Sequence, residues 1–390
     1  MFKRIILIIM DSVGAGAAPD AAGFGDEGAN TLAHIDERVN GLRLPHLFSL
    51  GLGRIVPLKN SQNDACMGSW GCMREISVGK DTTSGHWEMM GHPVDRPFPV
   101  FYEGFPEELM RSFTEKTGHG YLGNEVASGT EIIERLGKEH IETGKPIVYT
   151  SADSVFQIAA HEDVIPLEEL YRICKITREE VCVGAYEVGR IIARPFIGAP
   201  GAFVRTANRH DYSRLPEHEM VFSYLTKAGY TVQGIGKIGD IYAHIGLTNS
   251  TPTVSNHDGM ETLAKRIKET DEPGLIMANL VDFDSQYGHR RNPEGYGACL
   301  EEFDQDLGRL LPLLGEDDLL LITADHGNDP TFAGTDHTRE QVPLLAYCRG
   351  MIPADLGVRT TFADVGKTIL ENFGIQAPLT GTSFLKEIKR

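Results

Sequence analysis

Three short apolar segments of this 390-residue chain lead into acidic residues: Ile5–Met10 precedes Asp11, Leu275–Val281 precedes Asp284, and Leu319–Thr323 precedes Asp325. Apolar segments of this length, without polar alternation, are typical of strands buried on both faces. In open parallel sheets, ligands bind beyond the carboxyl ends of the strands, so the three carboxylates are expected to converge on one rim. Carboxylates that converge in this way need a cation.

Histidines close to these acids supply neutral ligands. His289 lies five residues after Asp284, His326 adjoins Asp325, and His337 follows in a Gly-Thr-Asp-His-Thr segment. Three carboxylates and three imidazoles suffice for two divalent ions with open positions for a substrate oxygen, the arrangement used in phosphoryl transfer. Mixed oxygen and nitrogen ligands admit Mn²⁺ or Zn²⁺ and disfavour Ca²⁺.

Each of these residues also has an ordinary interpretation. An aspartate after a strand is often only a helix cap or turn residue, and a single histidine is usually structural or solvated. The prediction of a metal centre therefore depends on the joint occurrence of all six.

A segment from Gly79 to Trp87 supplies adjacent hydroxyls between glycines, namely Thr82, Thr83 and Ser84. A hydroxyl of this kind attacks phosphorus only if a metal lowers its pKa and holds it in line. The residue types alone do not distinguish the three, and the alternative is a plain surface turn.

The elements that must position these residues are those of an α/β protein. A fourth apolar segment, Val342–Tyr347, resembles the first three. From Asn292, with Pro293 in the first turn, apolar residues recur at helical spacing as far as Leu311. Strand, loop, helix and strand together predict a mainly parallel sheet between helices.

Prolines and aromatic residues crowd the stretch around Pro97, and a second such stretch lies near Pro216. We interpret residues 98–214 as a domain inserted into a discontinuous core of residues 1–97 and 215–390. Within the insert, a helix is expected over Thr130–Gly137 with Thr130 as its cap.

Composition limits the function classes. Lys and Arg number 37 against 55 Asp and Glu, giving a net charge of −18 that disfavours nucleic-acid binding. The six cysteines are scattered, as in reduced cytosolic proteins. The first apolar segment is too short for a signal sequence or a membrane span, so we expect a cytoplasmic protein without membrane attachment. The oligomeric state is left open, with a monomer as one interpretation.

The motifs together resemble those of the bacterial phosphopentomutases, a family in the alkaline phosphatase superfamily. The similarity rests on Met-Asp11-Ser-Val-Gly, Gly-Lys-Asp-Thr82-Thr-Ser-Gly-His-Trp-Glu, Asp284 with Gly-His289-Arg-Arg, Thr-Ala-Asp325-His326-Gly-Asn-Asp and Gly-Thr-Asp-His337-Thr-Arg-Glu, and it extends almost from end to end. It implies an alkaline-phosphatase-like core with a smaller inserted α/β cap.

The resemblance also implies the chemistry. Two Mn²⁺ ions, replaceable in vitro by Zn²⁺ or other divalent ions, would be held by Asp11, Asp325 and His326 and by Asp284, His289 and His337. Thr82 would be the residue phosphorylated, because related mutases place the nucleophile three residues before a Gly-His pair. The reaction implied interconverts ribose 1-phosphate and ribose 5-phosphate, or the 2-deoxy sugars, through a 1,5-bisphosphate, with a sugar bisphosphate as activator.

Basic residues in and after the insert are candidates for holding the pentose phosphate substrate. A guanidinium suits the phosphate that does not react, and the inserted cap would keep water from the phosphoenzyme. The candidate substrate-binding residues are Ser151, Asp153, Arg190, Arg205, Arg209 and Lys237. Surface pairing with the abundant acids is the alternative for each arginine.

Two other functions compete with this hypothesis. One is a phosphatase, phosphodiesterase or phosphoglycerate mutase that uses the same metals on another substrate. The other is a metal-binding or sugar-phosphate-binding protein without catalytic activity.

Overall fold

The computed structural model describes residues 1–61, 66–151, 154–388 and 390. The chain divides into two compact units, a larger one of Met1–Arg96 and Pro216–Arg390 and a smaller one of Pro97–Leu215. These divisions lie one residue from the boundaries expected from the sequence.

The larger unit is built on a sheet of eight strands. In sheet order these are β10 (Asn249–Thr251), β9 (Thr231–Ile235), β11 (Gly274–Leu280), β1 (Arg4–Met10), β12 (Asp318–Thr323), β13 (Val342–Tyr347), β2 (Ser69–Met73) and β14 (Asp355–Arg359). Within this sheet β13 alone runs opposite to the others, pairing antiparallel with both neighbours. The expected mainly parallel α/β fold is confirmed, although the apolar segment at Val342 did not reveal its direction.

The core lies along the central strands. Ile5 to Met10 of β1 are fully buried, and β11 and β12, its parallel neighbours, are buried throughout. Each such side chain contributes about 1.5–3 kcal/mol relative to exposure. This rigid centre places the carboxyl ends of three adjacent strands side by side.

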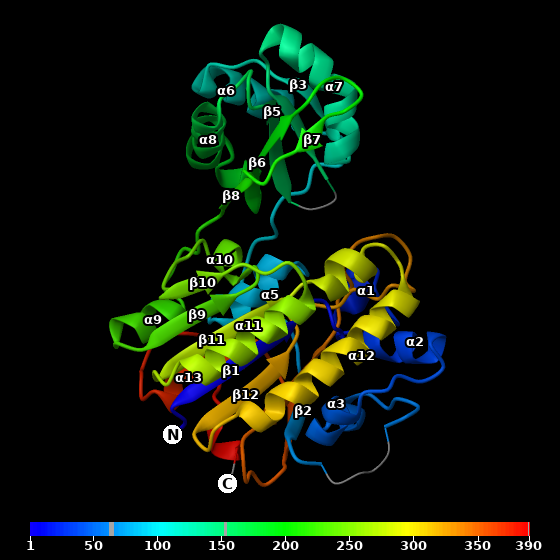
Figure 1. Cartoon of the computed structure of the whole chain (residues 1–390), viewed down its shortest axis with the longest axis vertical. Coiled ribbons are helices and arrows are strands. Elements are labelled where there is room, and N and C mark those ends of the chain that lie inside the picture. Colours follow the sequence, from blue (N-terminus) through cyan, green and yellow to red (C-terminus); the bar gives the residue numbers. More distant parts are fainter. Residues whose placement is uncertain (62–65, 152–153, 389) are drawn as a thin grey trace. The chain divides into compact units, whose positions relative to one another are not determined.

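Helices accompany the sheet. They are α1 (Ala21–Phe24), α2 (Thr31–Arg38), α3 (Pro45–Leu50), α4 (Leu52–Ile55), α5 (Thr82–Met89), α9 (Val221–Lys227), α10 (Ile238–Ile241), α11 (Asn256–Glu269), α12 (Pro293–Leu310) and α13 (Ala363–Asn372). Figure 1 shows α11 and α12 crossing in front of the central strands. The predicted helix after Asn292 is α12, and the Asn292 side chain caps it by accepting from the Gly295 N–H at 2.9 Å.

The smaller unit has its own sheet and core. Its strands are β3 (Leu122–Val126), β4 (Ile147–Thr150), β5 (Val155–His161), β6 (Arg190–Ile197), β7 (Val204–Arg205) and β8 (His210–Ser213), and its helices are α6 (Glu107–Thr117), α7 (Gly129–Thr143) and α8 (Leu167–Ile176). The rings of Phe105 and Phe156 stack at 4.3 Å in its core. The predicted cap at Thr130 is wrong, because α7 begins one residue earlier, with Ser128 in the capping position.

The larger unit is discontinuous in sequence, yet its two segments meet next to the insertion. The Val221 N–H donates to the Met90 carbonyl at 3.1 Å, and the rings of His92 and His218 lie 5.6 Å apart, edge to face. The chain therefore leaves and re-enters this unit at neighbouring points. In the part of the chain that the structure describes, no helix has the length and apolar character needed to span a bilayer.

Candidate active site

The carboxyl ends of β1, β11 and β12 carry the predicted acidic residues. Asp11 directly follows β1, Asp325 lies two residues after β12, and Asp284 lies in a short π-helix, Phe283–Gly288, after β11. Met10 is in register with Leu280, and Ile9 with Thr323, so the three strands end at the same level. The parallel register brings these carboxylates together.

Asp11, Asp325 and His326 form a first group whose ligand atoms all lie within 4.8 Å of one another. His326 Nε2 is 3.5 Å from Asp11 Oδ1 and 3.4 Å from Asp325 Oδ2. All three residues are almost fully buried.

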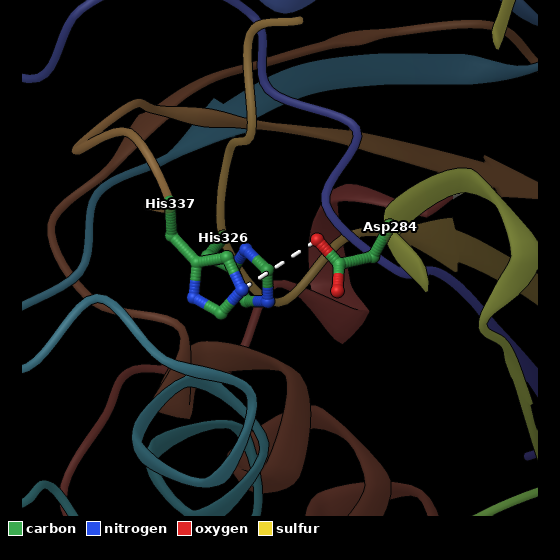
Figure 2. A group of neighbouring side chains, drawn as sticks. All are labelled: Asp284, His326 and His337. Atoms are coloured by element: carbon green, nitrogen blue, oxygen red, sulfur yellow. Dashed lines mark ion pairs between the residues drawn. The ribbon is translucent and has the colours of Figure 1, made fainter. Parts of the chain in front are cut away.

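Asp284, His289 and His337 gather beside the first group. His289 Nε2 lies 3.1 Å from Asp284 Oδ2, and His337 Nε2 lies 3.5 Å from Asp284 Oδ1. The ring of His337 stacks on that of His326 at 3.9 Å, and Figure 2 shows both rings facing the Asp284 carboxylate. Asp284, His326 and His337 thus form a second group within 4.8 Å, in which His326 is shared with the first.

The main chain orients all three imidazoles. Nδ1 of His289 contacts the Thr335 carbonyl at 2.7 Å, that of His337 contacts the Lys80 carbonyl at 3.0 Å, and that of His326 contacts the Gly327 carbonyl at 3.1 Å. A carbonyl oxygen only accepts, so each Nδ1 carries a proton, and Nε2 is the nitrogen that binds a metal when the ring is neutral. Metal-ligating histidines are held in this way.

The arrangement fits divalent cations. Nε2 of His289 and Nε2 of His337 lie 3.1 Å apart, close enough for both to bind one cation. Asp11 Oδ1 and Asp325 Oδ2 are buried without a hydrogen-bond partner among the described residues. Buried carboxylate oxygens without donors are costly unless an ion binds them. The two groups can therefore hold divalent metal ions.

The pKa shifts of the aspartates agree with binding of cations at this site. Burial, and then the charges of Asp325 and Asp284, raise the pKa of Asp11 to about 8. Burial also acts to raise the pKa of Asp284, but His337 and His289 outweigh it and hold that pKa well below its usual range. Protons and cations therefore compete for Asp11.

Thr82 lies next to the metal ligands. It is the first residue of α5, and its Oγ1 is 3.2 Å from His326 Nε2. Ser84 Oγ instead donates to Asp81 Oδ2 at 2.6 Å, and Asp81 also caps the helix by accepting from the Thr83 and Ser84 N–H groups. Of the three candidate hydroxyls, the geometry favours Thr82.

Gly85 allows this helix to approach. A Cβ at Gly85 would lie 2.0 Å from the Asp325 carbonyl oxygen, so the α5 backbone touches the end of β12 at a position where any side chain would collide. The glycine in the Thr-Thr-Ser-Gly-His motif is therefore required by packing against the metal-binding segment.

Supporting residues that sequence reasoning missed surround the ligands. Asn279 Nδ2 donates to Asp11 Oδ2 at 2.8 Å, and Asn328 Nδ2 donates to Asp284 Oδ1 at 2.7 Å. His86, fully buried, donates from Nδ1 to the Thr82 carbonyl at 2.8 Å and lies 3.1 Å from Asp325 Oδ2. Burial opposes protonation of His86, but the nearby Asp325 outweighs it and raises the pKa. Asn279 is the penultimate residue of β11, and Asn328 lies close after Asp325; these positions are the signal that could have found them.

The candidate substrate-binding residues fall in both units. In the smaller unit Arg209 forms a two-pronged pair with Asp211 at 2.7 and 2.6 Å, and Arg190 lies 3.7 Å from the same carboxylate. Arg205 and Arg209 both act electrostatically on Tyr149, whose buried hydroxyl has no hydrogen-bond partner among the described residues. These three arginines therefore share one neighbourhood.

The other candidates are more scattered. Ser151 follows β4 and is half-buried, whereas Asp153 lies outside the described residues. Lys237 belongs to the larger unit, where it is exposed at the start of α10. Its charge partly offsets the rise in the pKa of Asp11 that burial and the charges of Asp325 and Asp284 cause.

Comparisons with known proteins identify the family of the chain and proteins of similar structure. The Metalloenzyme superfamily matches residues 3–377. Among solved structures, the PH0037 protein from Pyrococcus horikoshii has a TM-score of 0.54 at 14% identity, with 98% of this chain and 100% of that one covered, and it shares the fold. A Leishmania mexicana phosphoglycerate mutase gives a TM-score of 0.49 at 12% identity, covering 98% and 97% of the two chains. An alkaline phosphatase superfamily protein from Vibrio parahaemolyticus gives 0.45 at 11%, covering 98% and 70%.

The site thus combines two buried Asp/His metal groups with a hydroxyl at their edge, the equipment of a metal-dependent phosphoryl-transfer enzyme. The match over residues 3–377 shows that the chain belongs to the Metalloenzyme superfamily.

Proposed function

We propose that the chain is a phosphopentomutase, which interconverts ribose 1-phosphate and ribose 5-phosphate and the 2-deoxyribose equivalents. The observation that carries the proposal furthest is the position of Thr82 Oγ1, 3.2 Å from the imidazole that the two metal groups share. A hydroxyl at this point can accept a phosphoryl group and give it back. The motifs around Thr82, His289 and His337 favour the pentose phosphate among substrates of the superfamily.

Asp11, Asp325 and His326 would hold one Mn²⁺, and Asp284, His289 and His337 the other. When bound, the ions supply Lewis acidity, which stabilises the charge on the transferring phosphoryl group and lowers the pKa of the threonine hydroxyl. Zn²⁺ suits the same mixture of ligands.

The transfer uses phospho-Thr82 as donor. The bond from phosphorus to Thr82 Oγ1 breaks as a bond forms to the free hydroxyl of the pentose phosphate, and the proton of that hydroxyl passes to Thr82. The resulting 1,5-bisphosphate then returns its other phosphate to Thr82, which gives up its proton to the sugar oxygen. Asp81, by capping α5, fixes the turn that carries Thr82 during both transfers.

The smaller unit would act as a cap that excludes water, because a mutase must protect its phosphoenzyme from hydrolysis. Arg190, Arg205 and Arg209, with Ser151, would bind the phosphate and hydroxyls that do not react, and Lys237 would assist from the larger unit. A sugar bisphosphate would phosphorylate Thr82 at the start. In the cell this activity would connect nucleoside breakdown with pentose phosphate metabolism.

The test is isomerisation of ribose 1-phosphate by the Mn²⁺-loaded protein. Formation of ribose 5-phosphate without net release of inorganic phosphate is expected, whereas phosphate release without ribose 5-phosphate would show a phosphatase instead. Intact mass should reveal one phosphoryl group that Thr82→Ala removes. Thr83→Ala is the matched control, and it should keep both the phosphoryl group and the activity.

A further inference from the structure

Arg291 occupies an unusual place next to the second metal group. It lies two residues after His289, between the π-helix Phe283–Gly288 and Asn292, which caps α12. Its backbone φ is 51°, in the left-handed region that residues with a Cβ seldom adopt. A residue held in this conformation needs surrounding contacts that over-determine it.

The guanidinium supplies those contacts by bridging three separate segments. Nη1 donates to the Gly288 carbonyl at 2.9 Å, to the Asp329 carbonyl at 3.3 Å and to the side-chain oxygen of Asn328. Nε donates to the Gly334 carbonyl, and Nη2 donates to the Asp336 carbonyl at 2.8 Å. One side chain thus fastens residues 288, 328–329 and 334–336 to one another.

Two of these segments, 328–329 and 334–336, support the proposed ligands of the second ion, Asp284, His289 and His337. Asn328 donates to Asp284 Oδ1 at 2.7 Å, the Thr335 carbonyl accepts from His289 Nδ1 at 2.7 Å, and Asp336 Oδ1 accepts from the His337 N–H at 2.8 Å. Asp284, His289 and His337 come from two loops far apart in sequence. Arg291 is the residue that connects the supports of all three.

We infer that Arg291 is a positioning residue that assembles the second metal site before the ion binds. The fan of donors on a planar guanidinium serves acceptors in several directions at once, which the single ammonium of lysine cannot reproduce. The first group does not depend on it, because Asp11 and Asp325 are set by strand ends and by Asn279 and the Ser12 N–H. Loss of Arg291 should therefore weaken one metal site and spare the other.

The experiment is a titration of metal-stripped full-length protein with Mn²⁺ in the absence of sugar phosphate. The electron paramagnetic resonance signal of the free ion measures how much Mn²⁺ is bound. Wild type should bind two ions. Arg291→Lys and Arg291→Gln should keep the tight binding of one ion and weaken the other by about 10- to 100-fold, as supporting residues of metal ligands do. The exposed neighbour Arg290 supplies the matched control, since Arg290→Lys should leave both affinities unchanged.

A second readout separates positioning from general damage. Thermal unfolding of the metal-free variants should match the wild type closely, and excess Mn²⁺ should restore the second ion. Unchanged affinities in both Arg291 variants, or an equal loss at both sites, would overturn the inference. It requires two ions but no particular substrate, so failure of the mutase assay leaves it standing, and failure here leaves the mutase proposal standing.

Discussion

Replacing Gly85 by alanine tests how strictly the nucleophile is placed. The new Cβ would lie 2.0 Å from the carbonyl oxygen of Asp325 and 2.8 Å from its carbonyl carbon. An ordinary contact begins at 3.4 Å, so α5 and the end of β12 must separate by about 1.4 Å, the difference between 3.4 and 2.0 Å. Both obstacles are backbone atoms, which cannot rotate aside.

The separation acts on the contact that the proposed chemistry needs. Thr82 lies one turn before Gly85, and Asp325 adjoins His326, so the 3.2 Å approach between Thr82 and His326 must lengthen. A misplacement of about 1 Å can cost about 100-fold in rate, and we expect a loss of that size in kcat. Overpacking should also cost about 1–3 kcal/mol of stability, offset in part by the better helix propensity of alanine.

The assay is steady-state conversion of ribose 1-phosphate at saturating Mn²⁺, with thermal unfolding of the same samples. Gly23→Ala is the matched control, because that glycine is also helical and a Cβ there meets nothing within 4 Å. Wild-type kcat in Gly85→Ala, with the protein folded, would refute the argument that this close approach sets the position of Thr82.

Three further predictions follow from the site. When a chelator is added, the ion held by Asp284 and His289 should leave first, because the His289 side chain is 33% exposed whereas that of Asp325 is 0% exposed. Atomic absorption measures the ions that remain bound, and loss of both ions at one rate would contradict this prediction. In the metal-free folded protein the pKa of Asp11 is about 8, against an ordinary value of 3.8. Between these pH values Asp11 binds a proton in the folded state but not in the unfolded state. The free energy of unfolding should therefore fall as pH rises from about 4 to about 8. Asp11→Asn should flatten this dependence in thermal melts with a chelator, and an unchanged slope would refute the assignment. Arg205→Ala should raise KM for ribose 1-phosphate about tenfold with both metals retained, as expected for one lost charged hydrogen bond, and an unchanged KM would remove Arg205 from the substrate site.

The sequence was most informative where position along a strand determines position in space. Asp11 and Asp325 could be placed on one rim because parallel neighbouring strands end together, and the register of β1 with β12 does bring them together. The α/β class followed from the same buried apolar segments, and the start of α12 from Asn292 and Pro293. These inferences used only local patterns.

Other features depend on contacts that no local pattern encodes. The direction of β13 depends on its pairing with β2, more than 250 residues away in sequence. His86 could not be distinguished from an ordinary helix residue until its distance to Asp325 was known. The geometric preference for Thr82 over Thr83 and Ser84 likewise depends on the position of His326, which lies on another part of the chain.

The close approach of Met90 and Val221 has a consequence for how such proteins diversify. The chain leaves and re-enters the larger unit at adjacent points. The inserted segment can therefore be exchanged or enlarged while the distance between its two attachment points in the larger unit stays short. Variation of the insert then leaves the candidate metal ligands unchanged, because all of them lie in the larger unit. A chimera that carries a foreign insert between Arg96 and Pro216 would be a natural starting point for redirecting this scaffold to new phosphate esters.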